Sequence, residues 1–185
     1  MNNYVPLDVC SAYSMGNSIC QIPRLVRKAR EMGFPAIALT DRNFMFGAAE
    51  FHAACHSRQT KFGGDFPPIK PIIGRSVAAT MNEKHYVIRL YAKNKTGYRN
   101  LVRISSAEVK PQGAQDRFIA FSEIEKWSEG LICMTSDMEP DFVDKCLRVF
   151  GDDFAFMAEN DDFDSSAWPS VMVCAANPVR FIEKD

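Results

Sequence analysis

Residues 19–42 read ICQIPRLVRKAREMGFPAIALTDR, and this segment indicates the fold class most clearly. Its first part predicts an amphipathic helix over 19–32, because apolar residues recur every three or four positions and a glycine follows. These residues are Ile22, Leu25, Val26 and Ala29, followed by Gly33. The apolar run 36–40 is typical of a buried strand, and Asp41 and Arg42 stand where it ends. A helix that leads directly into a buried strand indicates an α/β protein.

The same alternation of apolar runs and helical patterns continues on both sides of this stretch. Seven short runs predict strands, at 5–10, 36–40, 71–78, 85–92, 130–135, 154–158 and 171–176. Further helices are predicted over 46–57, 97–106, 121–128 and 141–150. The rhythm favours a barrel or an open parallel sheet formed by one domain over 1–185, with the Gly- and Pro-rich segment 58–70 as an exposed loop insertion.

Composition excludes several classes of protein. Of the 185 residues, 46% are apolar and 11% aromatic, which is too rich for a disordered or fibrous chain. No apolar run is long enough to span a membrane, no basic leader opens the chain, and the six cysteines are scattered without a C-x-x-C pair. The sequence therefore predicts a cytoplasmic protein with reduced thiols and no membrane partner.

The net charge of −1 conceals an asymmetry along the chain. Residues 1–110 carry 16 basic and 7 acidic side chains, whereas residues 111–185 carry 6 and 16. Mutual attraction of the two halves explains this pattern, and so does a nucleic-acid-binding surface within the basic first 110 residues. The role of the acidic residues 111–185 stays open at this stage.

Candidate functional residues follow the apolar runs, because parallel βα folds place their chemistry at the carboxyl ends of strands. These positions hold Asp8, Cys10, Asp41, Arg42, Arg75, Ser76, Asp137, Asn160, Asp161, Asn177 and Arg180. They offer carboxylates, arginines and one thiol but no histidine, whereas a hydrolytic metal site needs several His, Asp, Glu or Cys ligands. His52 and His56 lie four apart on a predicted helix with Cys55 between them, a spacing that can bind a metal, but no fourth ligand is near in the sequence.

Seven segments in the same order resemble the PHP (polymerase and histidinol phosphatase) domain of the bacterial DNA polymerase III alpha subunit. They are YVPLDVCSAYS (4–14), MGFPAIALTD (32–41), MFGAAEF (45–51), KPIIG (70–74), AKNKTGYRNL (92–101), SEGLI (128–132) and NPVRFI (177–182). The resemblance implies a distorted (β/α)7 barrel. Active members of this family bind up to three divalent metals and cleave phosphoester bonds, and some contact a proofreading exonuclease subunit.

The metal-ligand positions of that family hold other residues here. Where the resemblance implies ligands, the chain has Asp8, Cys10, Asn17, Arg42, Ser76, Val87, Asp137, Pro178 and Arg180, while Asp41 is kept. His85 lies two residues before Val87 and is a possible relocated ligand. We expect a vestigial cleft lined by Asp8, Cys10, Asn17, Asp41, Arg42, Ser76, Asp137 and Arg180, without catalytic or metal-ligating residues. The two arginines are expected to pair with Asp8 or Asp137 in place of the metals.

Three functions are compatible with these observations. The first is a metal-free scaffold of, or derived from, a replicative polymerase alpha subunit, whose partners are the rest of that subunit and the proofreading exonuclease. The second is a phosphoesterase or 3'-5' exonuclease that uses Zn or Mn at a site rearranged from Asp8, Cys10, Asp41, His85 and Asp137. The third is a module that binds DNA through residues 1–110. None of the segments carries polymerase carboxylates, so this chain alone is not expected to synthesise DNA.

Overall fold

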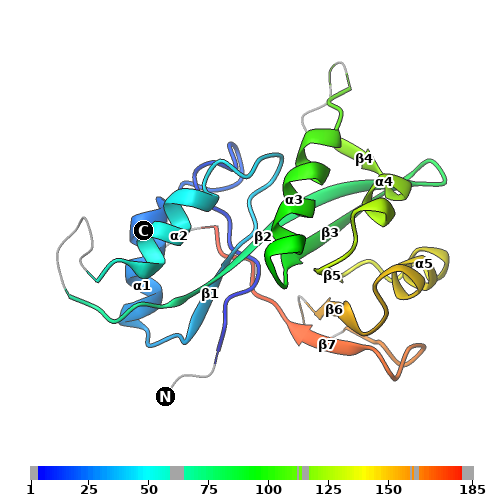
Figure 1. Ribbon diagram of the computed structural model, residues 1–185. Coiled ribbons are helices and arrows are strands. Elements are labelled where there is room, and N and C mark those ends of the chain that lie inside the picture. Colours follow the sequence, from blue (N-terminus) through cyan, green and yellow to red (C-terminus); the bar gives the residue numbers. More distant parts are fainter. Residues whose placement is uncertain are drawn as a thin grey trace. The chain divides into compact units, whose positions relative to one another are not determined.

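The computed structural model describes residues 4–58, 65–111, 113, 117–158, 160 and 163–180. The chain divides into two compact units, which we call the first unit (residues 1–74 and 177–185) and the second unit (75–176). Figure 1 shows the helices and strands of both units. No helix within the described ranges is long and apolar enough to cross a membrane.

The first unit is built around residues 19–42. Its elements are α1 (Ile22–Glu31), β1 (Ala36–Leu39), α2 (Ala48–His56) and the first residues of β2 (Lys70–Met81). Strand β1 pairs in parallel with β2, from Ala36 opposite Lys70 to Leu39 opposite Ile73. The apolar face of α1 is buried as predicted, because Leu25, Val26 and Ala29 pack into a core with Phe51 and Ile69.

The predicted strand 5–10 is wrong, because this segment is extended but forms no strand ladder. Its carbonyl groups accept bonds from β1, with Ala38 N–H to Pro6 O at 2.9 Å and Thr40 N–H to Val9 O at 2.8 Å. On the other side Val9 forms an isolated parallel bridge with Val179. Pro6 has no N–H to donate, which limits regular pairing.

The second unit contains most of the sheet. Its strands are the remainder of β2, β3 (Lys84–Ala92), β4 (Phe118–Ala120), β5 (Leu131–Thr135), β6 (Phe154–Ala158) and β7 (Met172–Ala175). Its helices are α3 (Lys95–Ala107), α4 (Phe121–Lys126), α5 (Pro140–Phe150) and the 3-10 helix Gly151–Asp153. The sheet has seven strands, in the order β1-β2-β3-β5-β6-β7, with β4 beside β2.

Seven strands were expected, but the set and the directions differ from the prediction. Strand β4 was missed and takes the place of the segment 5–10 in the count. Strands β3 and β5 pair antiparallel, with Leu90 opposite Cys133, whereas β5, β6 and β7 run parallel. Strands β2 and β3 are joined by a two-residue turn at Asn82 and Glu83, which both have positive φ, and this tight turn produces the change of direction.

An aromatic cluster fills the core of the second unit. The ring of Tyr86 on β3 stacks on Phe142 of α5 with 3.8 Å between ring centroids, and Phe121 of α4 meets Phe142 edge-on at 5.5 Å. Helix α3 lies against the turn before β5, because a Cβ atom on Gly97 would come within 1.9 Å of the carbonyl oxygen of Gly130. These contacts hold α3, α4 and α5 against the sheet.

The loop predicted over 58–70 is shorter than expected. Lys70 begins β2, and Ile69 is buried and donates its N–H to the carbonyl of Cys55 at 3.0 Å. Residues 59–64 of the predicted loop lie outside the described residues, as do Glu159, Asp161 and Asp162 of the acidic part of the chain.

Candidate functional site

The candidate site of the first unit centres on Asp41, which follows β1 and is 2% exposed. Its carboxylate accepts three hydrogen bonds, from the N–H of Ser11 at 2.6 Å, the hydroxyl of Ser11 at 2.7 Å and the hydroxyl of Ser14 at 2.7 Å. The N–H of Arg42 in turn donates to the Ser14 hydroxyl at 3.0 Å. Both carboxylate oxygens are therefore bound by neutral donors that fix the loop 11–14 to the end of β1.

Asp8 is the second buried carboxylate of this site, and it is bound to the far end of the chain. Arg180 Nη2 lies 3.3 Å from Asp8 Oδ2, and the hydroxyl of Thr40 donates to Asp8 Oδ1 at 3.2 Å. The backbone supports this pair, because the carbonyl of Arg180 accepts from the hydroxyl of Ser18 at 3.0 Å. The expected pairing of Arg180 with Asp8 is confirmed.

The Cys10 thiol lies beside these groups and is a poor ligand as it stands. Burial raises the pKa of Cys10, and the nearby Arg180 guanidinium only partly opposes this. The thiol donates to the carbonyl of Thr40 with 3.6 Å between Sγ and O. A metal ion or an electrophile needs the thiolate, which this environment disfavours.

Arg42, which follows β1, contacts Asn17 on the loop 11–20. Arg42 Nη1 donates to Asn17 Oδ1 at 3.3 Å, so two predicted cleft residues are joined through an amide oxygen. Six cleft residues are thus brought together within the first unit: Asp8, Cys10, Asn17, Asp41, Arg42 and Arg180.

The two remaining residues of the expected cleft, Ser76 and Asp137, and the possible relocated ligand His85 belong to the second unit. Asp137 follows β5 and accepts from the N–H of Val87 at 3.0 Å and from the hydroxyl of Thr135 at 3.3 Å, which is a turn-stabilising arrangement. Ser76 is buried on β2. His85 is exposed, and its ring lies 4.6 Å from that of Phe118. The expected pairing of an arginine with Asp137 is replaced by these neutral donors.

Sequence reasoning missed Ser11, Ser14 and Thr40, which supply the donors to the two buried carboxylates. The only signal was a pair of serines three residues apart directly after the first apolar run. Their hydroxyl groups reach Asp41 across a sequence separation of about 30 residues, which no local pattern encodes. Ser11 and Ser14 can bind Asp41 because of the path of the loop 11–14, and the residue types alone do not predict it.

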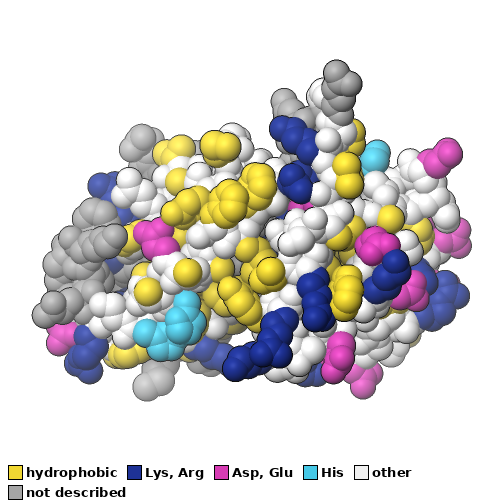
Figure 2. Space-filling model, turned by 45° about the horizontal axis from the view of Figure 1, so that its top comes forward, with side chains coloured by type: hydrophobic (Ala, Val, Ile, Leu, Met, Phe, Trp, Pro, Cys, Tyr) yellow, Lys and Arg dark blue, Asp and Glu magenta, His cyan; other side chains and the backbone are white. Residues whose placement is uncertain are grey.

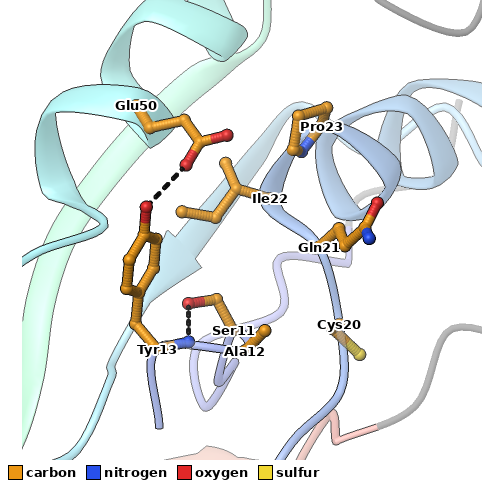
Figure 3. Close-up of a pocket in the computed structure, with 8 residues that line it drawn as sticks. All are labelled: Ser11, Ala12, Tyr13, Cys20, Gln21, Ile22, Pro23 and Glu50. Atoms are coloured by element: carbon orange, nitrogen blue, oxygen red, sulfur yellow. Dashed lines mark hydrogen bonds between the residues drawn. The ribbon is translucent and has the colours of Figure 1, made fainter.

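A small pocket opens beside this network. It has a volume of about 280 Å³ and is lined by Ser11, Ala12, Tyr13, Cys20, Gln21, Ile22, Pro23 and Glu50 (Figure 3). Figure 3 shows Tyr13 pointing toward Glu50, and its hydroxyl donates to Glu50 Oε2 at 3.2 Å. This bond raises the pKa of Tyr13. A Cβ atom on Gly47 would lie 2.9 Å from the Tyr13 ring, so glycine is needed there for the ring to take this position.

The residues of this site do not fit the metal cluster that the resemblance implies. Within the described ranges, no group of three or more His, Cys, Asp or Glu side chains is arranged to hold a metal ion. Asp8 is bound to a guanidinium, Asp41 to an amide and two hydroxyl groups, and Cys10 favours the neutral thiol. A divalent cation bound to Asp8 would lie beside the positive charge of Arg180, which disfavours its binding.

The family model of the PHP domain matches residues 7–167, which includes parts of both units, so the chain belongs to the PHP domain family. Within that family the chain is similar to the DNA polymerase III alpha subunit. It is 34% identical to that of Bacillus subtilis over 137 residues (72% of this chain, 11% of the relative) and 32% identical to that of Halalkalibacterium halodurans over 145 residues (78% and 12%). The chain thus spans about one eighth of the length of these relatives.

Solved structures show the fold. A candidate metal-dependent phosphoesterase from Bifidobacterium adolescentis superposes with a TM-score of 0.68 at 8% identity, covering 100% of this chain and 90% of that one. An amidohydrolase from Chromobacterium violaceum gives 0.62 at 11% identity, covering 95% and 87%. The expected α/β fold of the PHP barrel type and the resemblance to polymerase III alpha subunits are confirmed.

Proposed function

We propose that this chain is a non-catalytic PHP domain that acts as a scaffold of, or derived from, a replicative DNA polymerase III alpha subunit. The observation that carries the proposal is that two carboxylates at the implied metal-ligand positions are already bound by other groups of this chain. Asp8 pairs with Arg180, and Asp41 binds Ser11 and Ser14.

The physical effect of these contacts is to replace metal ions by internal donors. Carboxylates brought together without cations repel one another, and a guanidinium cannot lose its charge near neutral pH. Arg180 therefore supplies permanently the positive charge that a bound ion supplies reversibly. Hydroxyl groups and backbone N–H groups satisfy Asp41 without adding charge, so the loops keep one arrangement in the absence of any ligand.

A docking role is supported by apolar side chains on the same loops. Tyr13, Met15 and Ile19 lie on the loop 11–20 and Phe46 on the loop after β1, with exposed fractions of 42, 83, 76 and 67%. Figure 2 shows hydrophobic side chains gathered over the first unit. Clustered exposed apolar groups mark protein interfaces, and the polymerase core or the proofreading exonuclease is the partner that the family context offers.

The first test is metal content together with hydrolysis. The purified chain is incubated with zinc and manganese, desalted, analysed for bound metal and assayed on a phosphodiester substrate. We expect neither stoichiometric metal nor hydrolysis. Two or three bound metal ions, with hydrolysis that is lost in Asp8→Ala, would instead establish the rearranged enzyme site built from Asp8, Cys10, Asp41, His85 and Asp137.

The second test addresses docking directly. The double variant Met15→Asp, Ile19→Asp is compared with Met32→Asp, a control because Met32 is 50% exposed at the end of α1, outside the loop 11–20. Binding is measured by titration calorimetry against a polymerase III alpha subunit lacking its own PHP domain and against the exonuclease subunit. We expect the double variant alone to lose binding by at least tenfold. Equal binding by all three proteins contradicts a docking surface on these loops.

A further inference from the structure

Helix α3 has two chemically different faces. Its buried face consists of Gly97, Asn100, Leu101 and Ile104. Its outer face is exposed and carries Lys95, Tyr98, Arg99, Val102 and Arg103. Tyr98 and Val102 are 41% and 43% exposed although they are large and hydrophobic. We call these five residues the α3 outer face.

The charges on the α3 outer face are all positive and regularly spaced. Lys95, Arg99 and Arg103 follow one another at intervals of four residues, which places them in one row with a rise of about 6 Å per step. The helix contains no acidic residue. Lys95 is its first residue, where the helix dipole disfavours a positive charge, so helix stability does not account for the row.

Neighbouring lysines of the second unit form ion pairs, whereas the three cations of this row form none with the residues that the structure describes. Lys126 binds Glu123, Lys145 binds Glu125 and Lys93 binds Asp153, each through an ammonium-to-carboxylate contact of 2.5–2.7 Å. Within the part of the chain that the structure describes, Lys95 and Arg99 form no ion pair. Figure 2 shows several Lys and Arg side chains on the face of the molecule that it draws.

Arg103 is held in place by uncharged partners. Its guanidinium lies 4.5 Å from the centre of the Trp127 ring, and Nη1 donates to Asn100 Oδ1 at 3.0 Å. These contacts orient the guanidinium, and among the described residues no carboxylate pairs with it. A pre-oriented cation loses less conformational entropy when it binds an anion.

We propose that the α3 outer face binds the phosphate backbone of a single-stranded nucleic acid. Lys95, Arg99 and Arg103 contact successive phosphates, and the exposed ring of Tyr98 stacks on a base. The aromatic ring among the cations favours nucleic acid over an acidic polypeptide, and it favours a single strand because paired bases do not offer a free face. This inference is independent of the scaffold function and of any metal.

The test measures the binding of a fluorescein-labelled oligo(dT) of about 20 nucleotides to the full chain by anisotropy, across a range of salt concentrations. The slope of log K against log salt is expected near −2 for three phosphate contacts, at about −0.7 for each contact. Lys95→Gln with Arg99→Gln should reduce the magnitude of the slope by about 1.4, which is a loss of about 25-fold in affinity at 0.1 M salt.

The matched control is Lys126→Gln with Lys145→Gln, which removes the same charge from the paired lysines of the same unit. It should keep affinity within about twofold of the unmodified chain. An equal loss in both double variants would show unspecific attraction and overturn the proposal, as would unchanged binding after Lys95→Gln with Arg99→Gln. Circular dichroism melts identify any variant that has not folded.

Two further arms test the kind of ligand. Tyr98→Ala should weaken oligo(dT) binding at least fivefold, since base stacking on an aromatic residue contributes about this much. Unlabelled duplex DNA and polyglutamate should both compete less well than oligo(dT) at equal charge concentration. Unaltered binding by Tyr98→Ala, or equal competition by the duplex, overturns the single-strand assignment. Equal competition by polyglutamate assigns the surface to an acidic protein instead.

Discussion

Asp41 of the first unit and Glu108 of the second are both buried carboxylates, but they are stabilised by opposite means. Asp41 is bound by an amide and two hydroxyl groups. Glu108 is bound by Arg75 Nη2, at 2.7 and 2.8 Å from its two oxygens, with Arg117 Nε 3.7 Å from Oε2. The first arrangement uses fixed dipoles and the second uses charges.

The two arrangements differ in what they cost to bury. Burial raises the pKa of Glu108, although Arg75 and Arg117 act in the opposite direction. Among the described residues, Nε and Nη1 of Arg75 have no hydrogen-bond partner, and its side chain is fully buried. The stability that the ion pair contributes therefore requires both partners to be present. The network around Asp41 instead consists of several weaker hydrogen bonds, each of which contributes part of the stabilisation.

The largest effect is expected for Arg75→Met, which leaves Glu108 buried without its closest charge partner. The free energy of unfolding should fall by about 3–5 kcal/mol, as it does when one partner of a buried pair is removed. Urea unfolding followed by tryptophan fluorescence measures this change.

The control is the double variant Arg75→Met, Glu108→Met, which should recover most of the loss because no charge remains buried. The loss in Arg75→Met should also be smaller at pH 4 than at pH 7. When the pKa of a carboxyl group is higher in the folded protein than in the unfolded chain, the folded protein loses stability as pH rises above the ordinary pKa near 4.5. A double variant as unstable as the single one would show that the two side chains stabilise the fold through their packing rather than through their charges.

A smaller loss is expected for Asp41→Asn, at about 2–3 kcal/mol. The amide group offers one acceptor oxygen to donors that now use two, and its own N–H points at a hydroxyl. The same urea experiment measures the loss, and hydrogen exchange of the Ser11 amide should accelerate in parallel. If that exchange rate is unchanged, the loop 11–14 is held by contacts other than those to Asp41.

Arg180→Gln should cost less again, about 1–2 kcal/mol, because the Arg180 side chain is 25% exposed and water screens part of its interaction with Asp8. A double-mutant cycle with Asp8→Asn isolates the interaction between the two side chains. A coupling energy indistinguishable from zero would mean that Arg180 and Asp8 lie side by side but that their interaction does not stabilise the fold.

The smallest effect concerns Glu139, whose carboxylate binds Lys84 and also accepts the N–H of Phe142 at the start of α5. These bonds hold the pKa of Glu139 below its ordinary value near 4.5. Their contribution is therefore present above pH 4.5 and is lost as pH falls through the folded pKa. The melting temperature of Glu139→Gln should lie slightly below that of the unmodified chain at pH 7 and converge with it at pH 3. Parallel curves from pH 7 to pH 3 would contradict this linkage.

Much of the fold could be predicted because its signals are local. Helix α1 follows from its apolar spacing and Gly33, and β1 from the run 36–40. Strand β4 was missed because three residues, Phe118–Ala120, are too few to show a period. The segment 5–10 is apolar enough for a strand, but Pro6 and the absence of a continuous partner prevent a ladder.

The site was predictable where charge alone decides the partner. Both arginines of the predicted cleft were expected to pair with Asp8 or Asp137 because buried carboxylates need a cation, and the structure pairs Arg180 with Asp8, 172 residues away. The partners of Asp41 were not predictable, since serine hydroxyls serve in many roles and only the path of the loop brings Ser11 and Ser14 within 2.7 Å. The partner of Arg75 was also missed, because Glu108 lies directly after α3 and no sequence pattern distinguishes it from other surface carboxylates.

The bridge between Val9 and Val179 makes the first unit of the chain the last to be completed during synthesis. Asp8, Val9, Cys10 and Ser18 emerge early from the ribosome, but their partners at 179 and 180 follow only after the whole second unit. At about 5–20 residues per second, the roughly 160–170 intervening residues take on the order of 8–34 s to be synthesised. During that interval one side of the extended segment 5–10 in the nascent first unit stays unpaired, and an unpaired strand edge is prone to aggregation.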